Sequence, residues 1–298
     1  MAAAAECHAA AMTDKTKEES MNKTKIDWCD MSWNPITGCL KGCDYCYAMG
    51  ITRRFGGTID TCPDSTLHIL DEPYYADQPG QEDGTSRVCH YPWMFDPTFH
   101  RYRLDDPMRI KNPKTIFVCS LADMFGQWIP DDWITQVLNS CATAHWHRYL
   151  FLTKNPSRYR SVIEYVDSIG FLPSDSGLDA YFGATAATTE QLYAAYESQA
   201  NWLCIEPMLE DMAIDFEDCV AGDGYYNSSS SARWDWVVLG AETGNRKGKI
   251  IPKREWIQRI VEVSKLWEIP VYMKRNLAKV WGEPLIQEFP WKGKETKV

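Results

Sequence analysis

Short apolar segments that alternate with amphipathic helical patterns limit most strongly how this chain can fold. Beyond the first third of the chain, apolar runs occupy residues 115–119, 149–153, 181–185, 202–205, 236–240 and 271–273. Helical patterns separate most of these runs, at residues 131–144, 157–167, 189–198 and 253–267. Apolar strands that alternate with helices indicate βαβ units and a parallel sheet.

An additional short strand at residues 32–37 brings the number of β/α repeats to about seven. This number predicts an α/β fold, namely a partial or complete TIM-like β/α barrel of parallel strands with a long insertion after the first helix. An open doubly wound sheet fits the same alternation. Its dinucleotide-binding version is weakly supported, because no Gly-x-Gly-x-x-Gly turn follows an early strand.

The chain's 298 residues allow one large barrel domain. Residues 1–25 are alanine-rich and then charged, so we expect a disordered N-terminal extension. The barrel is expected to span residues 26–276, and residues 277–298 form a C-terminal tail. Within the barrel, residues 58–103 form an irregular insertion, and a long segment of this kind is typical of a lid. A second irregular loop is expected at residues 211–233.

Composition narrows the functional class. No apolar run reaches the roughly 20 residues that a membrane-spanning helix needs, and no signal peptide is visible. Eleven cysteines are an odd number, which favours free thiols in a reducing cytoplasm over a disulfide framework. The net charge of −10 argues against a broad surface that coats nucleic acid, although it allows a local basic rim.

Three cysteines, Cys39, Cys43 and Cys46, follow the first strand at the spacing Cys-x3-Cys-x2-Cys. Thiolates are soft anionic ligands, and several together select an iron–sulfur cluster, zinc or copper(I). Gly38 and Gly42 allow the loop to curl until the sulfur atoms point inward. A four-iron cluster that is held by three thiolates keeps one iron open for another ligand.

Two other kinds of metal site fit parts of the cysteine and histidine pattern. A structural zinc site normally has four ligands, and here Cys29 or Cys62 would have to supply the fourth from a distance. The insertion also contains Cys62, Cys89, His90 and His100, but their uneven spacing gives only weak support to a second metal site.

The cysteine motif carries a resemblance to a known superfamily. Cys-x3-Cys-x-aromatic-Cys is the signature of the radical S-adenosylmethionine (radical SAM) enzymes, and Cys39, Cys43, Tyr45 and Cys46 match it. In that superfamily the three cysteines hold a 4Fe-4S cluster, and S-adenosyl-L-methionine (SAM) chelates the fourth iron. One electron then cleaves SAM to a 5′-deoxyadenosyl radical. The resemblance therefore implies both cofactors and an external electron donor.

The flanking sequence is similar to a phage-associated three-cysteine-motif family within that superfamily. The similar blocks are 33–39, 117–126, 151–154, 205–207 and 240–244. The likeness implies a nucleic-acid base or nucleotide as substrate, with isomerisation of an amino-acid adduct on a thymine-type base in phage DNA. It also implies the host cytoplasm as the location if the chain is phage-encoded. Two alternatives stay open: a lyase that repairs damaged thymines, as in the spore-photoproduct lyases, and a non-catalytic zinc-binding module.

Polar residues directly follow the apolar runs. In TIM-like barrels the chemistry lies at the carboxyl ends of the strands, so these residues should surround one opening together with the cysteine loop. They are Ser120, Asp123, Thr153, Lys154, Thr185, Glu206, Glu242 and Lys274. For any one of them, a helix cap or a surface ion pair is an equally good explanation.

The resemblance distributes roles among these residues. SAM offers a zwitterionic methionine, a sulfonium and a ribose diol, and we expect Tyr45, Ser120, Asp123, Thr185 and Glu242 to bind it. In the superfamily a Gly-Gly-Glu-like segment contacts the SAM amino group; residues 120–123 stand in its place here, with Asp123 as the substitute carboxylate.

Three more residues are predicted to be catalytic. Lys154 and Lys274 would anchor an anionic substrate group or pair with Glu206 and Glu242, and Glu206 completes the catalytic set. The basic loop at residues 246–249 and Arg158 would offer positive charge to a phosphate within a Debye length of about 8 Å.

Overall fold

The computed structural model describes residues 21–57, 66–77, 86–168, 178–222, 233–243 and 246–292. Most of the predicted N-terminal extension and Cys62 lie outside these residues. Within the described residues, no helix combines the length and the apolar character that crossing a membrane requires.

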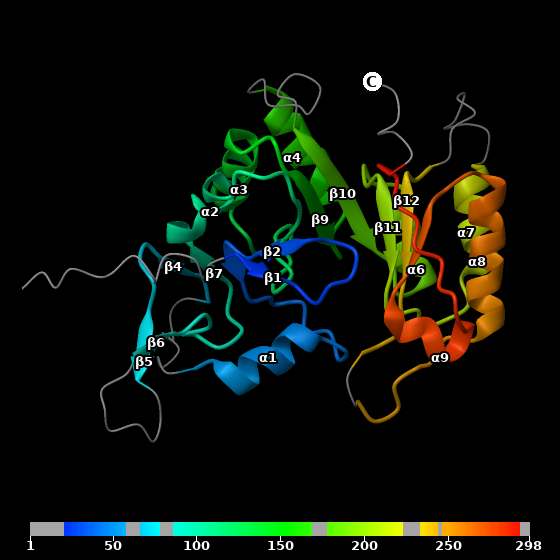
Figure 1. Cartoon of the computed structure of the whole chain (residues 1–298), viewed down its shortest axis with the longest axis horizontal. Helices are drawn as coiled ribbons and strands as arrows, with labels where there is room; N and C mark the ends of the chain where they lie inside the picture. The colour runs from blue at the N-terminus through cyan, green and yellow to red at the C-terminus, as the bar shows by residue number, and fades with distance from the viewer. Residues whose placement is uncertain are drawn as a thin grey trace, which may run out of the picture.

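Seven parallel strands form one curled sheet, which is a partial TIM-like barrel (Figure 1). Along the sheet the strands follow chain order: β2 (Met31–Trp33), β8 (Thr115–Val118), β9 (Arg148–Thr153), β10 (Asp179–Thr185), β11 (Trp202–Ile205), β12 (Trp236–Leu239) and β13 (Val271–Met273). The short strand β1 (Asn22–Lys23) pairs antiparallel with β2 at one edge. The predicted α/β fold is confirmed, in its partial form.

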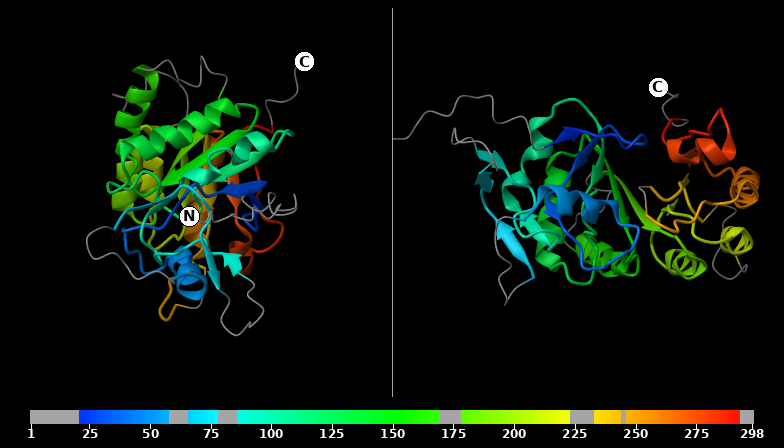
Figure 2. Two further views of the ribbon diagram at one scale, coloured as in Figure 1. Left: turned by 90° about the vertical axis from the view of Figure 1, so that its left-hand side faces the viewer. Right: turned by 90° about the horizontal axis from the view of Figure 1, so that it is seen from below.

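Helices cover the outer face of this sheet (Figures 1 and 2). They are α3 (Asp131–Thr143), α4 (Arg158–Ser168), α6 (Thr189–Tyr196), α7 (Ala213–Ala221) and α8 (Arg254–Leu266). Four of them match the predicted helices, but α7 lies where an irregular loop was expected. Its buried residues Ala213, Phe216 and Val220 recur at helical spacing, and the helix ends at Gly222, where φ is +66°.

The two faces of the sheet build two apolar clusters. In β11, Leu203 and Ile205 belong to the large cluster that includes the helices, whereas Trp202 faces the inside of the half-barrel. There it packs against Trp28 and Trp236, with ring centroids 5.6 Å and 5.3 Å away. Aromatic side chains bury large apolar areas, so these indoles fill much of the half-barrel interior.

The predicted first strand is divided in two. Residues 31–33 form β2, but Ile36–Thr37 (β3) joins a separate small sheet with β7 (Thr98–His100) and β4 (His68–Leu70). Pro35 lies between the two pieces, has no N–H to give to a ladder, and accepts a hydrogen bond from His100 N at 2.8 Å. The chain therefore leaves the barrel at this proline.

The insertion packs beside the first strands and the helix α1 (Tyr47–Phe55), on the left of Figure 1. Besides β4 and β7, its described part contains the pair β5 (Tyr75–Asp77) and β6 (Ser86–Val88), and the 3-10 turn Arg101–Arg103. The short helix α2 (Asp106–Arg109) then leads to β8. Each of these strands has three residues, too few to show a period in the sequence.

The chain after β13 folds back on the sheet. The turn Arg275–Leu277 and the helix α9 (Ala278–Trp281) follow β13. Met273 N then donates to Ile286 O at 2.7 Å, and Glu288 N donates to Val271 O at 2.9 Å. The described part of the predicted tail thus satisfies the outer edge of β13, which would otherwise present unpaired backbone groups.

Candidate active site

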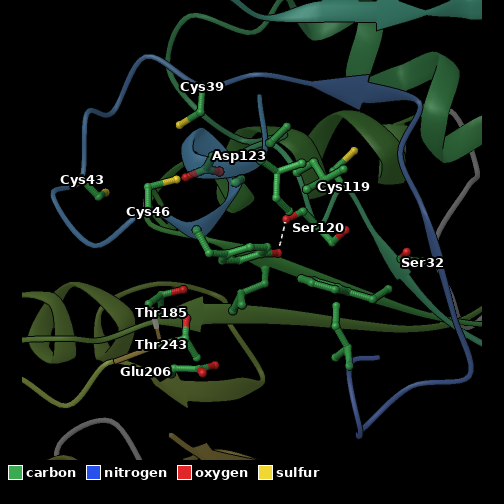
Figure 3. Close-up of a pocket in the computed structure, with 18 of the residues that line it drawn as sticks. Ser32, Cys39, Cys43, Cys46, Cys119, Ser120, Asp123, Thr185, Glu206 and Thr243 are labelled. Carbon is green, nitrogen blue, oxygen red and sulfur yellow. Dashed lines mark hydrogen bonds between the residues drawn. The ribbon is translucent and has the colours of Figure 1, made fainter. Parts of the chain in front are cut away.

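One pocket of about 790 Å³ opens at the carboxyl ends of the parallel strands. The cysteine loop borders one side of it, and Thr185, Thr243 and Glu206 lie on the other side (Figure 3). All eleven residues that were predicted to hold the metal, bind SAM or act in catalysis line this pocket: Cys39, Cys43, Tyr45, Cys46, Ser120, Asp123, Lys154, Thr185, Glu206, Glu242 and Lys274. The fold thus brings together residues that lie up to 235 positions apart.

The cysteine loop is held at its start by backbone contacts. Gly38 N donates to Leu121 O and Cys39 N donates to Phe95 O, both at 3.0 Å. Gly38 has φ +85°, and a Cβ there would lie 2.3 Å from the carbonyl oxygen of Asp96. Only glycine fits this position, so the path of the loop depends on it.

The three thiols of the loop are free and partly exposed. The Cys46 sulfur caps helix α1, where it accepts a hydrogen bond from Met49 N at 3.4 Å. Burial raises the pKa of Cys39 to about 11, and the neighbouring charges of Asp123, Cys43 and Cys46 add to this shift. Thiolates at these positions repel one another, and a positively charged centre between them would remove that repulsion.

Asp123 is fixed by donors from three directions. Its Oδ1 accepts hydrogen bonds from Thr153 Oγ1 at 2.6 Å and Phe125 N at 3.3 Å, and its Oδ2 accepts from Lys154 N at 3.0 Å. A carboxylate has about four acceptor positions, so one remains for a ligand. The side chain of Thr153 thus serves to orient Asp123.

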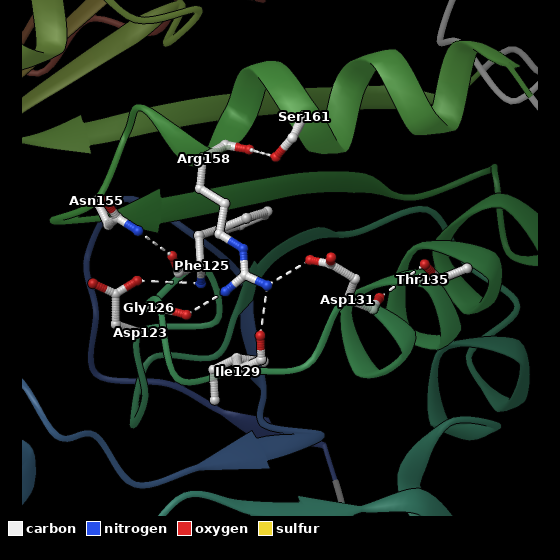
Figure 4. Close-up of polar contacts among 9 residues, drawn as sticks. All are labelled: Asp123, Phe125, Gly126, Ile129, Asp131, Thr135, Asn155, Arg158 and Ser161. Carbon is white, nitrogen blue, oxygen red and sulfur yellow. Dashed lines mark hydrogen bonds and ion pairs between the residues drawn. The ribbon is translucent and has the colours of Figure 1, made fainter.

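Arg158 secures the segment that carries Asp123 (Figure 4). Its guanidinium donates to the carbonyl oxygens of Gly126 and Ile129, and it forms an ion pair with Asp131 at 2.5 Å. The expectation that Arg158 offers charge to a phosphate is therefore wrong, because its donors are engaged between β8 and α3.

Ser120 lies in a network that the sequence pattern does not single out. Asn34 Oδ1 accepts hydrogen bonds from Ser120 Oγ and Leu121 N, both at 3.1 Å. The hydroxyl of Tyr47 donates to Ser120 O at 2.5 Å. Asn34 and Tyr47 both line the pocket. The only signal for them is their place beside the motif, directly before Pro35 and directly after Cys46.

Lys154 lies beside the cysteine loop. Its Nζ is 5.8 Å from the ring centroid of Tyr45, within the range of a cation–π interaction. Burial opposes the charged form of Lys154, but the acidic groups around it, Asp123 among them, outweigh burial and raise the pKa of Lys154 overall. Lys154 is therefore cationic at neutral pH.

Glu206 and Lys274 form an ion pair across the ends of β11 and β13. Lys274 Nζ lies 2.6 Å from Glu206 Oε2. Burial lowers the pKa of Lys274, but the charge and hydrogen bond of Glu206 outweigh it and raise the pKa overall. A Cβ at Gly240 would lie 2.8 Å from Glu206 Cδ, so the absence of a side chain at Gly240 makes room for this carboxylate.

Glu242 is paired with Arg246 of the predicted basic loop. Arg246 Nε and Nη2 each donate at 2.7 Å to one oxygen of Glu242, whose side chain is 1% exposed. These hydrogen bonds lower the pKa of Glu242. Arg246 thus neutralises a buried carboxylate of the pocket. The backbone N–H of Ile250 also donates to this carboxylate, so about one of its four acceptor positions remains. Thr185, at the end of β10, is buried beside this part of the pocket.

The fold and the pocket define an α/β half-barrel protein with a three-cysteine loop at the carboxyl edge of its strands. The chain belongs to the family DUF5131, described as a protein of unknown function, whose model matches residues 23–294. No curated protein matches the chain.

Among solved structures, the chain is similar to a spore photoproduct lyase complexed with dinucleoside spore photoproduct. The TM-score is 0.49 at 10% identity, over 85% of this chain and 78% of that chain. It is also similar to a double mutant of spore photoproduct lyase with bound AdoMet and dinucleoside spore photoproduct, with a TM-score of 0.47 at 10% identity and the same coverage.

Proposed function

We propose that the chain is a radical SAM enzyme in which Cys39, Cys43 and Cys46 hold a 4Fe-4S cluster. One observation carries this proposal: three free, partly exposed thiols at the motif spacing lie on one loop that opens into the strand-end pocket. Three cysteine thiolates supply three of the four ligands that such a cluster needs. The loop that would hold the cluster lines a pocket large enough for a cofactor.

The donor set fits a cluster better than a single ion. Among the described residues, no three His, Cys, Asp or Glu side chains lie close enough together to hold one metal ion. The four ligands of zinc converge on one tetrahedral centre, with sulfur about 2.3 Å from the metal. The thiolates of a four-iron cluster bind different iron atoms and stand farther apart, as separate positions along one loop allow.

When bound, the cluster and SAM together supply a 5′-deoxyadenosyl radical that abstracts a hydrogen atom from the substrate. The chain's own residues bind SAM and the substrate and orient them. Asp123 has one acceptor position left for the ammonium group of SAM, and Glu242 has one left for a ribose hydroxyl. Ser120, Thr185 and the ring of Tyr45 complete the proposed SAM site.

Lys154, Glu206 and Lys274 are the proposed catalytic residues. Lys274 and Glu206 act as one paired unit that can hold a polar group of the substrate between a donor and an acceptor. Lys154 is cationic, and its position next to the cysteine loop suits it to anchor an anionic group near the cofactor.

We propose a nucleic-acid base or nucleotide as the substrate, and isomerisation of an amino-acid adduct on a thymine-type base as the reaction. The pocket wall offers aromatic faces at Tyr47, Tyr91 and Phe117, and a planar base can stack on such rings. Lys41 and Arg275 add positive charge at the pocket although the chain carries −10 overall. A base in duplex DNA would have to be flipped out, at a cost of a few kcal/mol.

The first experiment is anaerobic iron and sulfide analysis of the reconstituted protein with its absorption spectrum. The comparison is a triple variant, Cys39→Ala, Cys43→Ala and Cys46→Ala, with Cys219→Ala as control, since Cys219 is buried in α7. About four irons and four sulfides per chain, lost in the triple variant and kept in the control, are expected. Stoichiometric zinc without iron contradicts the proposal and leaves a binding module.

The second experiment follows the cofactor and then the substrate. Dithionite-reduced holoenzyme should release 5′-deoxyadenosine from SAM, and the triple variant should not. A screen of modified thymidines, as nucleotides and in single strands, then separates isomerisation from lyase repair. Conversion of an adduct to an isomer of unchanged mass is expected, and release of two unmodified thymines would instead identify a lyase.

A further inference from the structure

Arg103, at the end of the insertion, is a buried cation in the pocket wall. Arg103 is only 4% exposed, yet it lines the pocket. The guanidinium donates to three uncharged groups: Nε to Tyr102 Oη at 3.2 Å, Nη1 to Asn34 O at 2.8 Å, and Nη2 to His90 Nδ1 at 2.7 Å. All three acceptors are uncharged, and a ring nitrogen that accepts from a guanidinium carries no proton, so these contacts do not compensate the charge of Arg103.

The hydrogen-bond inventory leaves part of this side chain unused. A guanidinium has five N–H donors, and three of those of Arg103 are engaged. No carboxylate of a described residue lies within ion-pair distance of Arg103, and Asp106, three residues further on, pairs with Arg109 at 3.4 Å. Buried charges are normally paired, because an uncompensated one is strongly destabilising.

Two other cations at the pocket already have acidic partners. Lys274 pairs with Glu206 at 2.6 Å, and Arg275 with Asp27 at 3.9 Å. At the wall near Arg103 the neighbouring imidazole of His100 stays neutral, because burial and the charge of Arg103 both lower its pKa. Arg103 therefore gives this wall a positive charge that no described acid pairs with.

We infer that Arg103 is an anion-binding residue of the pocket, whose two remaining N–H groups bind the oxygen atoms of a carboxylate or phosphate. Planar guanidinium groups suit both anions. The identity of the anion rests on the proposed function: it is the carboxylate of SAM or the phosphate of a nucleotide substrate. Arg103 was not among the residues that the sequence singled out, and it would make the insertion part of the site.

The test compares matched ligands by anaerobic isothermal titration calorimetry of the reconstituted holoenzyme. One pair is thymidine 5′-monophosphate and thymidine; the other is SAM and decarboxylated SAM. The anionic member of at least one pair should bind at least tenfold more tightly, since a charged hydrogen bond is worth about 1.5–3 kcal/mol. The pair that shows the difference identifies the source of the anion.

Variants then assign the difference to this residue. Arg103→Gln should weaken the anionic ligand about 10- to 100-fold and leave its neutral partner within about twofold, and Arg103→Lys should fall between. Arg109→Gln is the control, because Arg109 does not line the pocket and its side chain is 49% exposed. Arg109→Gln should bind both members of each ligand pair with the affinity of the wild-type protein.

Two results overturn the inference: no difference within either pair for the wild-type protein, or an equal loss of anionic and neutral ligands in Arg103→Gln. The first of these results needs no variant, so it overturns the inference even if Arg103→Gln and Arg103→Lys do not fold. Iron content is measured on the same samples. If the protein contains no iron but binds the nucleotide in a way that depends on Arg103, the anion site proposed here stands and the proposed radical SAM function is wrong.

Discussion

The side chain of Asn276 joins Glu206 to the end of strand β12. Its Nδ2 donates to Glu206 Oε1 at 3.3 Å and to Ala241 O at 2.7 Å, and its Oδ1 accepts from Ala241 N at 3.0 Å. Lys274 holds the other oxygen of Glu206. Both oxygens of this carboxylate are thus fixed by residues that follow β13, which sets its direction in the pocket.

We therefore predict that Asn276→Ala lowers the free energy of unfolding by about 1–3 kcal/mol, because two backbone groups of Ala241 lose their partner. Urea unfolding followed by circular dichroism measures this change. Gln258→Ala is the control, since Gln258 lies exposed on α8, and it should change stability by less than about 0.5 kcal/mol. Equal effects of the two substitutions would contradict this role of Asn276.

A second prediction concerns Arg158, whose side chain is 13% exposed. Arg158→Ala should lower the free energy of unfolding by about 1–3 kcal/mol, because the carbonyls of Gly126 and Ile129 lose a charged donor. The loosened segment carries Asp123, so SAM binding should weaken as well. Arg160→Ala, at an exposed position two residues further on, should leave both measurements near wild type.

The positions of the pocket residues follow from the strand pattern. Parallel strands end at one edge of a sheet, so a polar residue directly after an apolar run, such as Glu206 or Lys274, could be placed from the sequence. Asn276 lies beyond the strand in a 3-10 turn, and Arg103 reaches the pocket through a contact with Asn34, 69 residues away. Such contacts depend on tertiary packing, which has no local period.

The lack of a local period also explains where the predicted fold differs from the observed one. The apolar period marks long strands such as β9 and β10, but it cannot mark the three-residue strands of the insertion. The predicted first strand, residues 32–37, also included Pro35, where the structure divides this strand in two. A proline within a run was the available signal that the run is not one strand.

A third prediction uses the lowered pKa of Glu242. Its hydrogen bonds to Arg246 hold the folded-state pKa below the unfolded value of 4.5. The pair therefore contributes stability above pH 4.5, and this contribution is lost as pH falls through the folded-state pKa. Wild type should be more stable than Glu242→Gln at pH 6.5, and the difference should shrink toward pH 3.5 in urea unfolding series.

Arg246→Gln provides the matched test of that pair. It should reproduce the pH-dependent loss, and adding it to Glu242→Gln should cost little more at pH 6.5, because the two side chains form one unit. A stability difference between wild type and Glu242→Gln that does not change between pH 6.5 and pH 3.5 would rule out the ion pair as its source.

The last prediction concerns the glycine at the start of the cysteine loop. Gly38→Ala places a Cβ 2.3 Å from the carbonyl oxygen of Asp96 and forces a residue with a side chain to adopt φ +85°. The left-handed conformation alone costs about 1–2 kcal/mol, and the backbone clash adds to it. The loop must move, so the variant should lose both stability and bound iron.

Gly50→Ala is its control in the helix that follows the loop. No atom lies within 4 Å of a Cβ built at Gly50, and an interior helical glycine replaced by alanine gains about 0.5–1 kcal/mol. The thermal unfolding temperature should therefore rise for Gly50→Ala and fall for Gly38→Ala. The iron content should stay unchanged in Gly50→Ala and fall in Gly38→Ala. Full iron content in Gly38→Ala would mean that the thiols reach the cluster without the loop path described above.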